Sequence, residues 1–236
     1  MPHPEGVIRV RADNPSVLTL DGTNTYVVGR WVVDPGPAIP SHLKAVRDAA
    51  NDGIEGVVLT HSHADHAEGA ALLDAPVTLP SEGESVGPFT ALATPGHSAD
   101  SVCLLFGRVC FTGDTVLGEG SVFIAPGEGS LSAYLDSLRR LRSLDLEVLC
   151  PGHGPYVWDP AAKLDEYLAH RLERERRLVS ALEAGLRTEE DLLDSAWSEV
   201  PAELRPAARL TLQAHLEKLR EEGRLPPDVG GPTSES

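Results

Sequence analysis

The stretch Leu59–Gly69, LTHSHADHAEG, places three histidines and an aspartate within six consecutive positions, 61 to 66. The chain of 236 residues has only nine histidines, so a third of them lie in this short run. A titratable run of this kind is poor material for a hydrophobic core, because buried charged groups must be paired. It is also too short and too regular to be a generic acidic surface. The run is therefore a candidate functional site.

The residues before the run place it at the end of a strand. The apolar segment GVVLT, residues 56–60, suits a short buried strand, so the histidines lie on the loop that leaves it. His61 and His63 are two positions apart and would project to the same side of an extended loop. Asp65 and His66 follow closely enough to serve a second centre.

Three further candidate ligands lie where other apolar segments end: His97 in TPGHS, Asp114 in FTGDT and His153 in CPGHG. Each is next to a glycine, which lets the backbone turn sharply and present a side chain outward. With the run they give five histidines and two aspartates, a nitrogen and oxygen set that suits zinc, with iron or manganese as alternatives. The remaining histidines lack this context and are interpreted as structural: His3, His42, His170 and His215.

Composition and charge narrow the class of protein. Hydrophobic residues make up 41% of the chain, enough for a core, which argues against a largely disordered protein. A net charge of −16 argues against a broad basic face on duplex DNA, although a local basic patch or bound metal ions can reverse the sign locally. No apolar run approaches the roughly 18–20 residues of a membrane span, and the N-terminus lacks a signal-peptide pattern, so the cytoplasm is the expected location. Cys103, Cys110 and Cys150 form no C-x-x-C pair and are expected to be small buried hydrophobes.

Strands and helices alternate over the first two thirds of the chain. Two hairpins are expected, over residues 26–33 and 101–114. Helical spacing of apolar residues predicts helices over 41–53 and 130–144, and a small helix is expected over 67–73. This order of elements indicates a layered α/β or α+β architecture.

The pattern changes near Pro160. From Ala161 onward apolar residues recur at helical spacing, which predicts a small helical module about the size of a winged helix. The predicted division is a main domain at 1–160, a winged-helix-like domain at 161–225 and a disordered tail at 226–236, which is rich in Pro, Gly and Ser. We expect the helical module to shape access to the site without supplying a catalytic group.

The motif Thr60–His66, THSHADH, resembles the T-H-x-H-x-D-H signature of the metallo-β-lactamase-fold hydrolase superfamily. The chain is most similar to the β-lactamase-like protein 2 group within that superfamily. The segments that carry this resemblance, in order, are NPSVLTLDGTNTYVVG, TPGHSADS, FTGDTVLGEGS, PGHGP and YLAHRLERERRLVSAL. The metal motifs are specific for the superfamily and say little about substrate.

The resemblance implies an α+β fold, an αβ/βα sandwich with two metal ions at one edge, followed by the winged-helix-like domain. It also implies that His61, His63 and His97 hold one metal and that Asp65, His66 and His153 hold the other. Asp114 would bridge the two, and Asp65 and Asp114 are the candidate catalytic residues. Asp34, which ends WVVDPG, would support the histidine loop; the alternative is a simple turn at the end of a strand. Many relatives have a histidine where this chain has Ser101, a departure that concerns substrate and not metal binding.

The implied reaction is hydrolysis by two Zn²⁺ ions, about 3.5–4 Å apart, that share a bridging water and make hydroxide available at neutral pH. A serine hydrolase is disfavoured because the chain has no G-x-S-x-G motif. A thioester or other small acyl substrate is slightly preferred, and single-stranded RNA is the alternative. The arginines of HRLERERR, among them Arg171, Arg174 and Arg177, are candidate contacts for an anionic substrate, or else a solvated helix face. The low aromatic content of 5% weakens the RNA hypothesis. A third hypothesis, a non-enzymatic regulator that binds DNA through its winged helix, fits poorly with the acidic composition.

Overall fold

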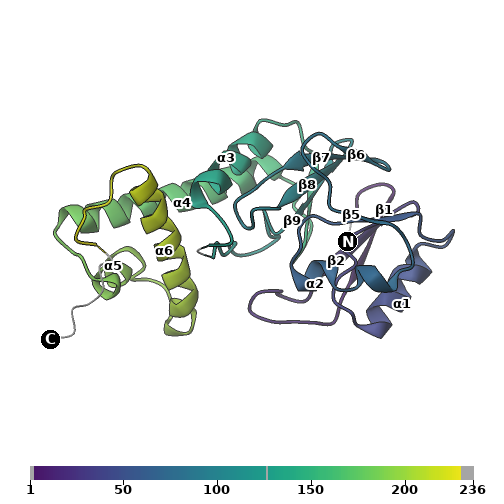
Figure 1. The fold of residues 1–236 in the computed structure, drawn as a ribbon, viewed down its shortest axis with the longest axis horizontal. Coiled ribbons are helices and arrows are strands. Elements are labelled where there is room, and N and C mark those ends of the chain that lie inside the picture. Colours follow the sequence, from purple (N-terminus) through teal and green to yellow (C-terminus); the bar gives the residue numbers. More distant parts are fainter. Residues whose placement is uncertain (1–2, 126, 230–236) are drawn as a thin grey trace.

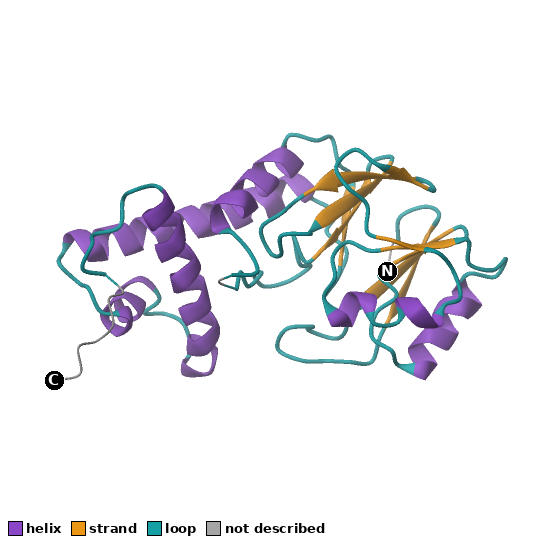
Figure 2. Ribbon diagram, in the orientation of Figure 1, coloured by secondary structure: helices purple, strands orange, loops and turns teal. Residues whose placement is uncertain are grey.

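Two five-stranded sheets lie face to face in the computed structural model, which describes residues 3–125 and 127–229 (Figures 1 and 2). The first sheet has the order β1-β2-β3-β4-β5, with bounds Val7–Arg11, Asn24–Val28, Trp31–Val33, Gly56–Val58 and Val77–Thr78. The second has the order β10-β9-β8-β7-β6, with bounds Val148–Pro151, Val109–Gly113, Val102–Phe106, Phe89–Ala93 and Ser85–Val86.

Both hairpins expected from the sequence are confirmed. Strands β2 and β3 pair antiparallel with Val28 opposite Trp31, and strands β8 and β9 pair antiparallel with Phe106 opposite Val109. Each pair is joined by a two-residue connection that begins with glycine, as the turn chemistry requires. The hairpins therefore set the register of one half of each sheet.

The helices cover the outer faces of the two sheets. Helix α1 (Pro40–Ala49) packs Leu43 and Val46 on the first sheet. Helix α3 (Leu131–Arg142) and the first turns of α4 (Pro160–Glu183) pack on the second sheet. Between the sheets lies a third cluster of apolar side chains that includes Tyr26. The order of layers is helix, sheet, sheet, helix, which confirms the predicted αβ/βα sandwich.

The small helix predicted over residues 67–73 begins earlier and is broken in two. Helix α2 spans Ala64–Ala67, and a short 3-10 helix, η1, spans Ala70–Leu72. The backbone NH groups of His66 and Ala67 already donate to the carbonyl of His63, so helical turns start inside the histidine run. The predicted bounds are wrong because the helix starts where these hydrogen bonds form, and the sequence pattern does not record them.

A separate helical module completes the chain. It comprises the second half of α4, α5 (Glu189–Ala196), a 3-10 helix η2 (Ala202–Leu204) and α6 (Arg205–Glu221), around an apolar cluster that includes Trp197. The predicted amphipathic helices are confirmed. Of the predicted disordered tail, Val229 is instead buried in this cluster, and residues 230–236 lie outside the described residues.

Helix α4 belongs to both parts of the molecule. Figure 1 shows it extending from the sandwich into the C-terminal module. Leu164 and Tyr167, near its start, pack in the sandwich core, whereas Leu178 and Ala181, near its end, pack in the core of the module. The domain boundary predicted near residue 160 thus falls at the start of a helix that the two cores share.

Three cysteines, Cys103, Cys110 and Cys150, are free and buried, as expected for small apolar side chains. None of the described helices combines the length and the apolarity that crossing a membrane requires.

Candidate metal centre

The candidate ligands meet because the strands that precede them end at one edge of the sandwich. Strands β7 and β9 are both antiparallel to β8, and β10 is parallel to β9, so β7, β9 and β10 run in the same direction. His97, Asp114 and His153 follow these three strands and emerge together. The histidine run follows β4 of the other sheet. It is tied to the second sheet by a backbone hydrogen bond, in which the Val102 amide donates to the carbonyl of Thr60 at 2.8 Å.

The first group of candidate ligands is His61, His63 and His97. One nitrogen from each ring lies within 4.8 Å of the others. Nε2 of His97 is 3.1 Å from Nδ1 of His63. Three imidazole nitrogens that converge in this way match the protein ligands of a four-coordinate zinc site with one position left for water or substrate.

The second group is Asp65, His66 and His153, which also offer one ligand atom each within 4.8 Å. Oδ2 of Asp65 is 3.2 Å from Nε2 of His153 and 3.5 Å from Nε2 of His66. Helix α2 carries both Asp65 and His66, so one helical turn aims two ligands at one point.

Asp114 lies between the two groups. Its Oδ1 atom is 3.4 Å from Nε2 of His66 and 3.3 Å from Nε2 of His153. Its Oδ2 atom is 3.8 Å from Nε2 of His97, in the other group. A carboxylate with one oxygen toward each group is placed to serve both.

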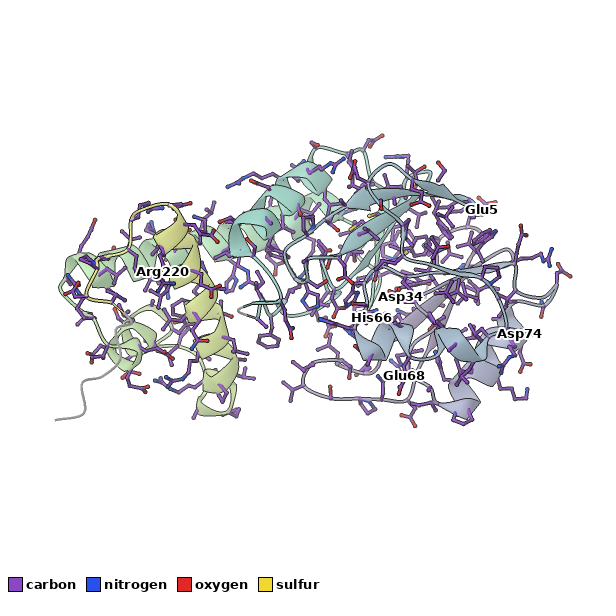
Figure 3. The ribbon with its side chains drawn as sticks, in the orientation of Figure 1. Glu5, Asp34, His66, Glu68, Asp74 and Arg220 are labelled. Atoms are coloured by element: carbon purple, nitrogen blue, oxygen red, sulfur yellow. The ribbon has the colours of Figure 1, made fainter. Side chains whose placement is uncertain are left out.

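Asp34 lies beside His66 of the cluster (Figure 3) and hydrogen-bonds to its ring. Its carboxylate accepts hydrogen bonds from the Thr60 amide at 2.7 Å, the Thr60 hydroxyl at 2.6 Å and Nδ1 of His66 at 2.9 Å. Its backbone has a φ of +48°, an unusual conformation for a residue other than glycine. Both interpretations of Asp34 therefore describe it: it turns the chain after β3, and it fixes the orientation of His66. Because its two oxygens are engaged, Asp34 is less suited than Asp65 to bind a metal directly.

The outer ring nitrogens of other histidines are also held. Nδ1 of His97 donates to the carbonyl of Phe123 at 2.9 Å, and Nδ1 of His61 lies 3.0 Å from the Thr60 hydroxyl. Nδ1 of His153 is 3.4 Å from the carbonyl of Gly22. These contacts leave Nε2 of all three rings facing the cluster, which is the arrangement that metal-binding histidines adopt.

Two buried atoms of the cluster support a metal ion. Nε2 of His61 and Oδ1 of Asp114 have no hydrogen-bond partner among the described residues, and a buried polar atom left in this state is costly. Both are good ligands for a divalent ion of the zinc type, and both point toward the atoms of the two groups. The residues present therefore fit the metal centre that the sequence predicts.

The electrostatics of the cluster differ between the groups. Burial and the neighbouring His66 lower the pKa of His61 to about 2, so this ring stays neutral, the form that binds metal. For His153, burial alone would lower the pKa, but the nearby carboxylates of Asp114 and Asp65 prevail and raise it to about 9. For Asp65, burial is outweighed by His153 and His66, which lower its pKa to about 2. The second group is thus a compact set of opposite charges.

Glycine is required beside the cluster at position 152. A Cβ atom placed there would lie 2.4 Å from Cε1 of His66 and 2.7 Å from Oδ1 of Asp114. Any side chain would displace one of these two groups. The glycine before His153 is therefore explained by the close approach of the backbone to the ligands, in addition to its role in the turn.

The cluster opens into a cleft of about 760 Å³. One side is formed by Leu18 and its neighbours in the loop between β1 and β2, and another by Phe123. Helix α6 of the C-terminal module contributes Pro206, Ala207 and Leu210. The C-terminal module therefore forms part of the wall of this cleft.

The arginines of α4 do not form a cationic face on this cleft. Arg171 is buried and donates to the carbonyl of Val122 and, at 3.1 Å, to the hydroxyl of Ser121. Arg174 donates to the carbonyl of Ala196 at 2.7 Å, and its ion pair with Glu199 is also 2.7 Å long. Arg177 pairs with Glu173 at 2.8 Å and with Glu199 at 3.2 Å. All three guanidinium groups therefore have partners within the protein, and Arg171 is buried and does not lie on a solvated helix face.

The sequence did not reveal the roles of Thr60 and Glu128 at the centre, and it singled out Ser101 without indicating its contact. Thr60 belongs to the motif and links Asp34 to His61, but its spacing alone does not reveal this role. Glu128 places a carboxylate oxygen 3.9 Å from Nε2 of His63, and its exposed loop gave no signal. Ser101 hydrogen-bonds to Ser98 at 2.6 Å, so it stabilises the loop after His97.

Comparisons with known proteins agree with this geometry. The sequence profile of the Metallo-beta-lactamase superfamily matches residues 18–86 and 76–153. The profile of the Beta-lactamase associated winged helix domain matches residues 188–225. The second match lies within the predicted C-terminal domain.

Individual relatives extend over most of the chain. A Beta-lactamase-like protein 2 homolog from Caenorhabditis elegans is 31% identical, over 93% of this chain and 85% of its own length. An Atrochrysone carboxyl ACP thioesterase from Aspergillus novofumigatus is 32% identical, over 75% of this chain and 62% of its own length. The crystal structure of a metallo-beta-lactamase family protein from Thermus thermophilus superposes with a TM-score of 0.74 at 22% identity and covers 92% of this chain and 94% of its own. This last similarity concerns the fold.

Proposed function

This chain belongs to the metallo-beta-lactamase superfamily, and we propose that it is a dinuclear-metal hydrolase that cleaves an ester-type bond, with thioesters or other small acyl compounds preferred. The observation that carries the proposal is the pair of ligand groups joined by Asp114 at the floor of a cleft that no described lysine or arginine lines. The paired ligand groups support hydrolysis, and the absence of lysine and arginine from the described lining of the cleft supports a substrate with an uncharged acyl group.

Two Zn²⁺ ions are the proposed cofactors, with iron or manganese as alternatives. His61, His63 and His97 would hold one ion, Asp65, His66 and His153 the other, and Asp114 would contact both. When bound, such ions make a nucleophilic hydroxide available from water near neutral pH and stabilise negative charge that develops on the substrate.

The side chains of the chain itself have distinct roles in this proposal. Asp34 orients His66 through Nδ1, and the carbonyl of Phe123 orients His97 in the same way. Asp65 is 31% exposed, more than Asp114 at 14%, and both line the cleft. Asp65 is therefore the carboxylate more accessible to a bound substrate, whereas Asp114 holds the two groups together.

The lining of the cleft favours an acyl substrate over RNA. Among the described residues, no lysine or arginine lines it, and a phosphodiester backbone is usually bound through such cations. Phe123 is the one aromatic side chain in the described lining other than the histidines, whereas single-strand binders stack successive bases on several aromatic rings. Apolar side chains, such as Leu117 and Val122, make up much of the remaining surface. The printed name of the Aspergillus relative, a thioesterase, is consistent with this preference.

A panel assay tests the proposal. The purified protein, loaded in turn with Zn²⁺, Fe²⁺ and Mn²⁺, is offered acyl-CoA thioesters, aryl esters, lactones and single-stranded RNA, each with and without a chelator. We expect metal-dependent hydrolysis of a thioester or ester that exceeds RNA cleavage and that is lost in Asp114→Ala. RNA cleavage with no acyl hydrolysis would replace the proposed substrate class, and activity that survives both chelation and Asp114→Ala would overturn the proposed mechanism.

A further inference from the structure

A second, smaller cavity adjoins the cleft. It has a volume of about 280 Å³ and lies between the sandwich and the C-terminal module. Five residues line both spaces: Leu18, Leu117, Val122, Phe123 and Ala207. The two spaces therefore adjoin, and these five side chains lie where they meet. We call this second space the apolar annex.

The rest of the annex is formed mainly by apolar side chains of the helical module. Trp197, Val200, Leu204 and Ala208 line it from α6 and the segment between α5 and α6. Arg171 and Arg174, which also border it, donate to backbone carbonyls, and Nε of Arg171 has no partner among the described residues. Most of the lining is apolar and offers contact area for hydrocarbon; the polar side chains on it, besides the two arginines, are Glu119, Ser121, His170 and Thr211.

Exposed apolar side chains gather around the two spaces. Val17 and Leu18, at the tip of the loop between β1 and β2, are 72% and 63% exposed. Leu204 and Leu210 of the C-terminal module are each 39% exposed and line the annex and the cleft respectively. Leaving large apolar groups in water is unfavourable, by roughly 25 cal/mol per Å² of apolar surface. Their position on two separate elements at one opening indicates an apolar ligand that covers them.

We propose that the apolar annex binds the hydrocarbon part of the acyl group, so that the enzyme selects medium-chain or bulky apolar acyl esters and thioesters over acetyl ones. This inference rests on the proposed hydrolase function and adds the substrate class. The reacting carbonyl would lie at the metal ligands, and the chain would run past Phe123 and Ala207 toward Trp197.

A chain-length series measures the effect directly. Acetyl-, butyryl-, hexanoyl- and octanoyl-CoA are compared by kcat/KM with the metal-loaded protein. Each methylene that enters the annex should raise kcat/KM roughly threefold to fourfold, from about 0.8 kcal/mol per buried methylene. A profile that is flat or falls with chain length would overturn the inference.

Two variants localise the effect. Ala207, which lines both spaces, is half-buried on α6, so Ala207→Leu narrows the passage without adding a polar group. We expect it to lower the octanoyl-to-acetyl ratio of kcat/KM about tenfold. Leu18→Ser, at an exposed position that cannot destabilise the core, should lower the same ratio several-fold. The matched control is Ala161→Leu, an exposed alanine of α4 outside both linings, which should leave the ratio as in the parent protein.

Binding of dodecanoate, measured by calorimetry on the full metal-loaded chain, separates the two proposals. If no acyl compound is hydrolysed but dodecanoate binds, and binds at least about fivefold more weakly to Ala207→Leu, the annex is supported and the hydrolase proposal fails. If acyl compounds are hydrolysed but dodecanoate binding and the chain-length ratio are the same in Ala207→Leu and Ala161→Leu, the hydrolase proposal stands and the annex is overturned. Absence of both hydrolysis and binding contradicts both.

Discussion

The edge of the sandwich and helix α4 are the two parts of the chain that the sequence marks with dense titratable residues, and the structure uses them in opposite ways. At the edge, seven side chains from four separate loops converge, and His61 and Asp114 are left with buried atoms that have no partner among the described residues. On α4, neighbouring arginines diverge to partners within the protein. Titratable side chains that converge from several strands therefore indicate a site. Charged side chains that follow one another on a single helix commonly find partners in the fold around them.

The largest effect is expected from removing the residue that joins the two ligand groups. Asp114→Ala should reduce kcat/KM by at least about a thousandfold, because both groups lose a ligand and the negative charge between them. The measurement is metal-dependent hydrolysis of the best acyl substrate, with circular dichroism to show that the variant is folded. Activity within about tenfold of the parent protein would mean that Asp114 does not join the groups.

Substitution of Asp34, which supports His66, should have a smaller effect than substitution of a candidate ligand. Asp34→Asn cannot accept both hydrogen bonds from Thr60 and also the one from His66, so the ring of His66 loses its orientation. We expect metal affinity to fall about 10- to 100-fold, as for other outer partners of metal ligands. Titration with a competing chelator measures it, and Asp21→Asn, at an exposed aspartate paired only with Arg11 among the described residues, is the control. Equal affinities in the two variants would leave Asp34 as a turn residue only.

Arginine substitutions on α4 test whether these side chains stabilise the fold. Arg171→Ala removes a side chain that is only 1% exposed and leaves the carbonyl of Val122 without its donor, so the free energy of unfolding should fall by about 3 kcal/mol. Arg176→Ala, at a side chain that is 74% exposed, should change it little. Denaturant unfolding of both variants measures the difference.

The same series tests whether α4 contacts substrate. Arg177→Ala breaks surface ion pairs with Glu173 and Glu199 and should leave both KM and the salt dependence of acyl-CoA hydrolysis unchanged. A higher KM with a weaker salt dependence would show that this arginine faces an anionic substrate, which is one of the two interpretations that the sequence left open.

The smallest expected effect is a change in the pH dependence of stability, and it comes from a histidine of the helical module, outside the candidate metal centre. His215 of α6 is fully buried, and neither ring nitrogen has a partner among the described residues. Burial, together with the positive charges of Arg171 and Lys218 and with His170, lowers its pKa to about 3. The folded protein keeps this ring neutral while the unfolded chain protonates it, so stability is lost as the pH falls below about 6.5 toward 3.

His215→Leu should remove that pH dependence. At pH 5 the parent protein should have lost about 2 kcal/mol of stability through this residue relative to pH 7.5, and the variant should not show this loss. Denaturant unfolding at both pH values, with the metal content held equal, measures the difference. The same acid sensitivity in His215→Leu and in the parent protein would assign it to other groups.

The sequence predicted most of the fold because its signals are local. The hairpin at residues 26–33 follows from strands separated by a glycine-containing turn, and the helix expected over 130–144 follows from apolar residues at helical spacing, which α3 buries. The start of α2 was wrong because the carbonyl of His63 begins a helical turn inside a run that the apolar pattern treats as loop. Such a competition between hydrogen bonds is not visible in residue spacing.

For the candidate site, the sequence predicted the ligands but not the contacts around them. Its seven ligand candidates follow from the motif and from glycine-flanked strand ends, and the structure brings them together. The fate of Arg171 could not be predicted, because its partner is the backbone of Val122, 49 residues away. The apolar annex was equally hidden, since Leu18 and Ala207 approach only when the C-terminal module packs beside the sandwich. Long-range packing, which a linear pattern does not record, decides both.

Elemental analysis of the purified protein and its variants tests the central claim most directly. Seven ligand candidates exceed what one tetrahedral ion can use, so we predict about two divalent ions per chain in the parent protein. Asp65→Ala should retain about one ion, whereas Asp114→Ala should lose part of both. A parent preparation that holds no stoichiometric metal and yet has full hydrolytic activity would contradict the account.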